Sequence, residues 1–313
     1  MNDEDQFYLI LPSDSSIKYF PQNTTTYFTT QLLHEIRLHG RWVVGLAEIQ
    51  FPRSFLHVRG ESSMENQISI VPKSVAEKLG IIEKPLVDSV RVNHTGSVDV
   101  AFSEYVDKNN ISVDKQLKIE LTKGKWKRLV TSYFPPGVYS EVADLIYTVN
   151  NTPEINKHVL VKQEKRNNQY ITLKKICQED CKIPGRHFVL ISDKLSSILG
   201  FAPQVLLPVD LYTARYPPTL SDGLPNKLFV YCDLCEPRIT GNVKTPLLRV
   251  VPVDTKKYIF GSTQVTNFSP PHYIPILHTA FRTIEIDIRD QLGLPVPFEL
   301  GTSTVTLHFK CIE

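Results

Sequence analysis

Two alternating segments near the end of the chain constrain the fold most. Residues 283–289 place three isoleucines on one face and charged residues on the other, and residues 304–310 repeat the alternation. Because successive side chains point to opposite faces of a strand, each segment is typical of a half-buried strand in an antiparallel sheet. Residues 290–301 between them contain two glycines and two prolines. We therefore expect a β-hairpin with a long loop, which indicates a β-sandwich.

Further strand-like segments lie toward both ends of the chain. Residues 41–52 are apolar on nearly both faces, which predicts a central strand that is covered on each side. Other strands are expected at residues 7–12, 24–32, 187–191, 227–233 and 245–253. About eight strong strands of this kind suit a two-sheet sandwich of the jelly-roll type.

The middle of the chain is less regular. Short strands are expected at residues 67–71, 90–92, 97–102, 117–121, 158–162 and 170–176. The best helix covers residues 140–150, with Ser140 as its N-cap. Residues 74–80 and 192–200 are two short helices that both end at glycine. They are either an internal repeat or the same strand–helix–glycine pattern used twice.

Composition argues against several classes of protein. The 313 residues carry 35 basic and 33 acidic side chains, so the net charge of +2 gives no general attraction to nucleic acid. The start of the chain is acidic, unlike a signal peptide, and no apolar run is long enough to span a bilayer. Five cysteines are few and odd in number, which fits a reducing compartment. We expect a protein made in the cytosol or nucleus, neither secreted nor inserted in a membrane.

Four cysteines form two near-neighbour pairs, and zinc is one interpretation of them. Cys177 and Cys181 are one pair, and Cys232 and Cys235 are the other. However, residues 228–235 resemble a strand, in which residues three apart point to opposite faces, and no glycine marks a turn. We therefore favour ordinary thiols over a zinc site.

Catalytic motifs are missing from the sequence. It has no nucleophile elbow, phosphate-binding loop, dinucleotide fingerprint or zinc-protease motif. Ser112 and Lys115 match S-x-x-K, a pattern short enough to arise by chance, and the nine histidines are scattered. We expect no catalytic residue, cofactor or metal, so the chain is not expected to be an enzyme; a hydrolase with an unfamiliar site is the disfavoured alternative.

A basic segment is the candidate nucleic-acid contact. It contains an aromatic residue among cations, and its members are Lys123, Lys125, Trp126, Lys127 and Arg128. Such a combination can bind phosphates and stack on bases. The alternative, which we favour, is that these lysines are solvated at the tips of hairpins.

Several sequence phrases, read in order, resemble one family. They are residues 7–13 (FYLILPS), 19–24 (YFPQNT), 42–52 (WVVGLAEIQFP), 136–140 (PGVYS), 247–252 (LLRVVP), 271–275 (PHYIP), 284–290 (IEIDIRD) and 297–301 (PFELG). Together they resemble the minor capsid, or penton-type, protein of Polinton/Maverick elements and adintovirus-like viruses.

The resemblance implies a mainly β fold with a single jelly roll, and a structural protein of the virion. It implies a homopentamer at the fivefold vertices of an icosahedral particle, beside a double jelly-roll major capsid protein. Packaged DNA and a cell-surface receptor are further candidate partners. An insertion would explain the irregular middle: we expect the jelly roll in residues 1–59 and 183–313, and a β-rich (α+β) insertion in residues 60–182.

Subunits in a five-membered ring contact one another through two different surfaces. Proline-rich loops with aromatic residues are our candidates for them, because such loops bury a large area and lose little entropy on ordering. The candidate residues are Tyr212, Tyr216, Pro217, Phe268, Pro271, His272, Tyr273, Leu294, Pro295 and Phe298. Two alternatives remain open. These loops can be connections packed within one subunit, and the protein can be a β-sandwich binding module for a receptor, a glycan or nucleic acid.

Overall fold

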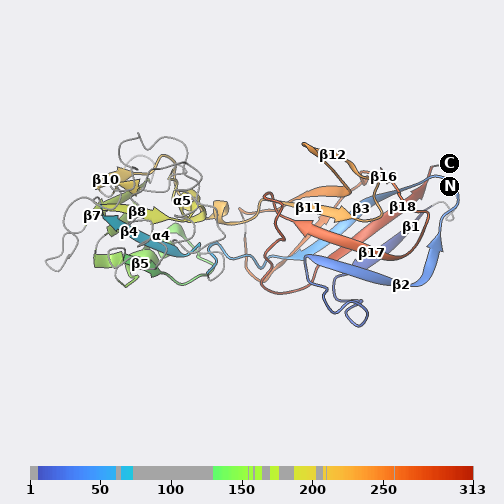
Figure 1. Ribbon diagram of the computed structural model, residues 1–313, viewed down its shortest axis with the longest axis horizontal. Coiled ribbons are helices and arrows are strands. Elements are labelled where there is room, and N and C mark those ends of the chain that lie inside the picture. The colour runs from blue at the N-terminus through green and yellow to red at the C-terminus, as the bar shows by residue number, and fades with distance from the viewer. Residues whose placement is uncertain are drawn as a thin grey trace, which may run out of the picture. The chain divides into compact units, whose positions relative to one another are not determined.

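The chain forms two units in the computed structural model, residues 1–55 with 225–313 and residues 56–224 (Figure 1). The structure describes residues 6–60, 65–72, 130–153, 155–157, 159–163, 170–175, 187–201, 207–208, 210–256 and 258–312.

The first unit contains two antiparallel sheets. The first sheet has the order β1-β18-β3-β15, with β16 also paired to β3; the bounds are β1 Gln6–Pro12, β18 Thr304–Cys311, β3 Trp42–Pro52, β15 Thr263–Asn267 and β16 Ile274–Pro275. The second sheet has the order β14-β11-β17-β2, with bounds β14 Leu247–Pro252, β11 Lys227–Cys232, β17 Ala280–Arg289 and β2 Tyr27–Arg37. A small hairpin joins β12 (Arg238–Thr240) to β13 (Val243–Thr245).

Strand pairing in this unit is nested. The first strand pairs with the last, β1 with β18; the second pairs with the last but one, β2 with β17. Inside these lie the pairs β3–β15 and β11–β14. Eight strands paired in this way over two sheets are a jelly roll. The predicted single jelly-roll sandwich is confirmed.

The core of the jelly roll follows from the alternation in the sequence. Ile284, Ile286 and Ile288 of β17 are fully buried, as are Val305, Leu307 and Phe309 of β18. The predicted hairpin is nevertheless wrong, because β17 pairs with β11 and β2 whereas β18 pairs with β1 and β3. The two strands face each other across the core instead, and the Phe281 and Phe309 rings lie 5.9 Å apart. Alternation identifies the buried face of a strand, but it does not identify the strand's partner.

The second unit is an α+β structure. One sheet has the order β5-β4-β8-β9 and another the order β10-β7-β6. The bounds are β4 Gln67–Pro72, β5 Val130–Tyr133, β6 Val159–Gln163, β7 Ile171–Lys175, β8 His187–Ile191, β9 Leu207–Pro208, β10 Asp210–Thr213, α4 Val142–Asn150, α5 Asp193–Ile198, η3 Ile155–Lys157 and η4 Leu220–Gly223. Leu145, Ile155 and Leu195 are fully or almost fully buried in its core. The expected strands at 90–92, 97–102 and 117–121 and the helix at 74–80 lie outside the described residues.

The insertion is longer than expected. Residues 183–224 were expected in the jelly roll but belong to the second unit, because β8 pairs with β4 and the side chains of α5 pack into that unit's core. Its two ends meet: a Cβ atom added at Gly223 would lie 2.8 Å from the carbonyl oxygen of His57. The insertion therefore leaves and returns to the jelly roll between β3 and β11 by adjacent segments.

The helix caps explain where the two helices begin. The N-cap of α4 is Glu141, not the predicted Ser140, because Asp144 accepts a hydrogen bond from the Glu141 N–H and completes a capping box. In α5, the Ser192 hydroxyl accepts a hydrogen bond from the Leu195 N–H at 3.1 Å. Gly200 then has a φ of +78°, which suits glycine at the end of a helix.

Candidate interaction surfaces

A row of aromatic rings crosses the outer face of the first sheet. Tyr8 of β1 lies opposite His308 of β18, and their rings stack with centroids 4.2 Å apart and planes 9° apart. The Tyr273 hydroxyl lies in hydrogen-bonding contact with His308 Nδ1 at 2.7 Å. Three segments distant in the sequence therefore meet at one histidine.

The segment that carries Tyr273, residues 268–276, lies against this face as a strap. Its end is β16, which pairs with Val43 and Val44 of β3. A Cβ atom at Gly45 would lie 2.8 Å from Pro271 Cβ and 3.0 Å from the His272 carbonyl oxygen. Glycine is therefore required at position 45 for the close approach of the strap.

His308 is held in its neutral form. Burial, with a smaller contribution from Lys310, lowers the pKa of His308. Its Nε2 atom is buried and has no hydrogen-bond partner among the residues that the structure describes. Within the same residues, no group of three or more histidine, cysteine or acidic side chains is placed to bind a metal. Of the three rings, His308 is buried, Tyr273 is half-buried and Tyr8 is exposed, so Tyr8 is the accessible part of the row.

The edge strand β1, which contributes Tyr8 to the row, exposes two large apolar side chains. Tyr8 is 59% exposed and Ile10 is 66% exposed, whereas Leu11 points into the core. Neither exposed residue belongs to the contacts predicted from the sequence. A signal was present, since residues 7–11 are apolar on both faces and such a strand is usually covered on both sides.

The predicted contact residues of the strap are only partly exposed. Phe268 is half-buried beneath the Arg249 guanidinium, whose carbon lies 4.3 Å from the ring centroid. Pro271 and Tyr273 are half-buried against β3, and His272 is exposed. The strap is thus largely a packed connection of its own subunit, with His272 accessible.

The predicted loop at residues 291–300 is divided in the same way. The Phe298 ring packs against Phe55 at 5.1 Å and Phe51 at 6.2 Å. Leu294 is 53% exposed, and Pro295 is exposed next to it. Of the three predicted residues of this loop, Phe298 therefore contributes to the packing, and Leu294 and Pro295 contribute to the surface.

The remaining predicted contacts lie in the second unit. Tyr212 is part of β10, where its backbone lies opposite Leu173 of β7. Tyr216 is 53% exposed, its N–H donates to the Gly200 carbonyl at 2.9 Å, and Pro217 beside it is exposed. The three predicted groups therefore do not form one patch within a single unit.

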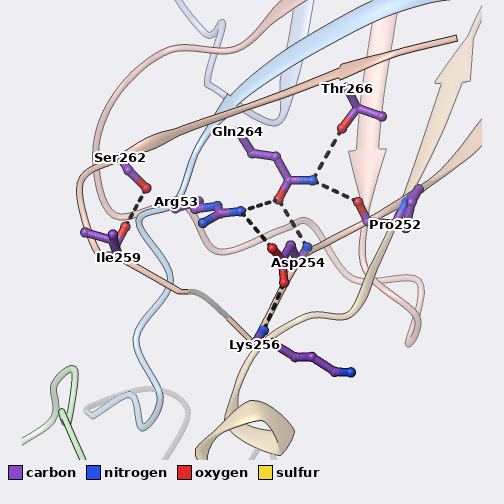
Figure 2. A network of polar contacts seen from close by, with 8 residues as sticks. All are labelled: Arg53, Pro252, Asp254, Lys256, Ile259, Ser262, Gln264 and Thr266. Carbon is purple, nitrogen blue, oxygen red and sulfur yellow. Dashed lines mark hydrogen bonds and ion pairs between the residues drawn. The ribbon is translucent and has the colours of Figure 1, made fainter.

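A polar network secures the end of the jelly roll next to the insertion. Figure 2 shows Gln264 of β15 at its centre, with its side-chain oxygen accepting from the Asp254 N–H at 3.2 Å and from Arg53 at 3.4 Å. Its amide nitrogen donates to the Pro252 carbonyl at 3.0 Å. Asp254 also forms an ion pair with Arg53 at 3.8 Å. The network links the ends of β3, β14 and β15 through side chains.

The cysteine interpretation needs a correction. β11 ends at Cys232, and a turn follows, so that Cys235 is not part of the strand as predicted. The Cys235 N–H donates to the Cys232 carbonyl at 3.1 Å, which closes the turn without glycine. Cys177, Cys181, Ser112, Lys115 and the basic segment at residues 123–128 lie outside the described residues.

Known proteins that are similar to this chain are found among the solved structures. No family model and no curated protein matches the sequence. The mavirus penton protein is similar over 98% of this chain and 99% of its own, with 12% identity and a TM-score of 0.43. A chain in the cryo-electron microscopy structure of the Sputnik virophage is similar over 98% of both chains, with 10% identity and a TM-score of 0.40. Among the described residues, the helices are all too short or too polar to cross a bilayer.

Proposed function

We propose that this chain is a structural minor capsid protein that assembles as a homopentamer at the fivefold vertices of an icosahedral particle. The nested jelly roll carries the proposal, because it supplies a rigid sandwich whose third connection holds a separate unit. The phrases that resemble the penton-type family support it: all except residues 136–140 lie in the jelly-roll unit.

A ring of five copies is closed by a heterologous interface, in which one surface of each copy meets a different surface of the next. We assign the outer side of β1, with Tyr8 and Ile10, to one of these surfaces. Two large apolar side chains exposed side by side on an edge strand are the kind of feature that contacts usually cover. The second surface takes the exposed members of the predicted set in the jelly roll, which are His272, Leu294 and Pro295. Tyr216 and Pro217 are exposed in the second unit and are separate candidates for contacts of that unit.

The remaining partners are part of the same proposal. A double jelly-roll major capsid protein would surround the ring, and packaged DNA or a cell-surface receptor would contact its inner or outer side. The protein would be made in the host cytosol or nucleus and reside in the virion. No chemistry is assigned to it, since assembly requires complementary surfaces only.

Mass in solution tests the proposal, measured by size-exclusion chromatography with light scattering over a range of concentrations. We expect a species of five times the 35.7 kDa chain mass, and fivefold rings in negative-stain images. Ile10→Lys should shift the population to monomer, because it places a charge in the apolar contact. The matched control is Ile239→Lys, which changes an 83% exposed isoleucine on the β12–β13 hairpin and should leave the ring intact.

A wild-type chain that stays monomeric at every concentration, alone and with the major capsid protein, would refute self-assembly. The binding-module alternative would then lead, and glycan-array binding or salt-dependent binding to DNA would decide between its two forms.

A further inference from the structure

The turn after β11 brings two cysteines into contact. Its hydrogen bond joins the Cys235 N–H to the Cys232 carbonyl, the pattern of a β-turn, in which the outer Cα atoms lie within about 7 Å. Disulfides join residues whose Cα atoms are about 4.4 to 6.8 Å apart. Both side chains are buried, and both thiols are free. The backbone of the turn thus places the two cysteines at a separation that a disulfide can span.

This turn connects the second sheet to the strap on the first. The Asp233 N–H donates to the Glu285 carbonyl of β17 at 3.3 Å. On the other side, the Leu277 N–H donates to the Leu234 carbonyl at 2.8 Å, and Cys235 forms a β-bridge with Ile276 at the end of the strap. A covalent bond within the turn would therefore fix the point where the two sheets are joined.

We propose that Cys232 and Cys235 form a redox-active dithiol, which a low-molecular-weight disulfide such as oxidised glutathione converts to an internal disulfide. One protein thiolate attacks the glutathione disulfide, forms a mixed disulfide and releases one glutathione thiolate. The second protein thiolate then attacks the protein sulfur of the mixed disulfide and releases the other glutathione. Both protein thiols lose a proton and are oxidised, and one glutathione disulfide is reduced to two thiols.

Access to this pair is controlled by the fold. Cys232 and Cys235 are 1% and 0% exposed, so a disulfide reagent reaches them only when the turn opens. The hydrogen bond to Cys235, together with burial, raises the pKa of the Cys232 thiol, which further slows thiolate chemistry. The dithiol therefore stays reduced during synthesis in a reducing compartment, and an oxidising environment converts it slowly to the internal disulfide.

Peptide mapping tests the inference on the full chain. Trypsin cuts after Lys227 and Arg238, and the peptide between them contains Cys232 and Cys235 and no other cysteine. After incubation with oxidised glutathione, denaturation and alkylation, we expect this peptide to be two hydrogens lighter and to carry no alkyl group. Gly45→Ala should react faster, since it loosens the strap beside the turn.

Two variants serve as controls. Cys311→Ser should leave the internal disulfide unchanged, whereas Cys235→Ser should yield at most a mixed disulfide at Cys232. Full alkylation of both cysteines, under conditions that oxidise the unfolded chain completely, would overturn the inference. A disulfide that links either cysteine to another part of the chain would overturn it equally, and both results are read from the wild-type protein, whether or not the variants fold.

Discussion

His57, at the start of the insertion, should make the second unit sensitive to acid. It is 4% exposed, and its Nδ1 atom accepts a hydrogen bond from the Tyr139 N–H at 3.0 Å. Burial, with a smaller contribution from Lys194, lowers the pKa of His57 from 6.5 to about 4. The folded chain therefore holds the neutral ring over a pH range in which the unfolded chain binds a proton.

The sign and size of the effect follow from this difference. Because the folded pKa is lowered, the stabilisation is complete above pH 6.5 and is lost as the pH falls toward 4. The full difference in pKa corresponds to about 3 kcal/mol. Solvent screening of the imidazolium reduces this, and we expect a loss of about 1 to 2 kcal/mol in the free energy of unfolding by pH 5.

Urea unfolding at a series of pH values, followed by circular dichroism, would measure the loss. Other groups also titrate in this range, so the decisive quantity is the difference between the wild type and His57→Asn. Asparagine retains an acceptor for the Tyr139 N–H but binds no proton, so the variant should lose less stability between pH 7 and 5. The matched control is His34→Asn, at an exposed position of β2. If the wild-type and His57→Asn curves are parallel, burial of His57 has no energetic consequence and the reasoning fails.

Three further changes test the packing. Gly45→Ala should cost about 1 to 3 kcal/mol, because the new Cβ meets Pro271 at 2.8 Å, whereas Gly137→Ala, with open space around it, should be nearly neutral in denaturant unfolding. Gln264→Leu should cost about 1 to 3 kcal/mol by leaving the polar groups of Figure 2 unpaired, and an unchanged unfolding midpoint would contradict that role. Replacing residues 56–224 by a short flexible linker should leave a cooperatively unfolding jelly roll, and a chain with no thermal transition would show that the units do not fold independently.

The sequence predicted the strands of the jelly roll well, because alternation reports local burial. Residues 7–12 and 42–52 form strands almost as expected, and β17 and β18 bury the predicted faces. The pairing of the strands could not be predicted from the sequence, since β17 and β18 are neighbours in the chain but belong to different sheets. Partner choice depends on contacts between residues that are hundreds of positions apart, and no local pattern records it.

The predicted boundary of the insertion differs from the boundary of the second unit for a related reason. The strand at 187–191 has the same apolar character as the jelly-roll strands, so its sequence fits either unit. Its pairing with β4 and β9, and the burial of Val189 and Ile191 in that core, assign it to the second unit. The turn at Cys232–Cys235 was missed because it contains none of the usual turn residues except Asp233, and backbone contacts to β17 and the strap hold it instead.

Of the residues predicted as subunit contacts, some are exposed and others are packed within the chain, and their role as contacts stays a prediction. Aromatic loops were a fair guide to exposed positions such as His272 and Leu294, yet Phe298 and Tyr273 are used within the subunit. The composition of a loop does not distinguish packing on its own sheet from contact with another subunit. The outer side of β1 was not among the predicted contacts, because that prediction covered proline-rich loops and not strands.

The nested order of the strands also determines how much chain entropy each pairing has to overcome. Of the four nested pairs, β11–β14 is the closest in the sequence, and each outer pair encloses the one before it. The entropy lost on closing a loop grows with the logarithm of its length, at roughly 0.6 kcal/mol for each doubling. Once an inner pair has formed, the next pair closes only the short connections that remain. Formation of β3–β15 encloses the whole insertion, but His57 and Gly223 meet in the folded second unit. A pre-folded insertion therefore behaves, for the closure of the sandwich, as a loop of only a few residues.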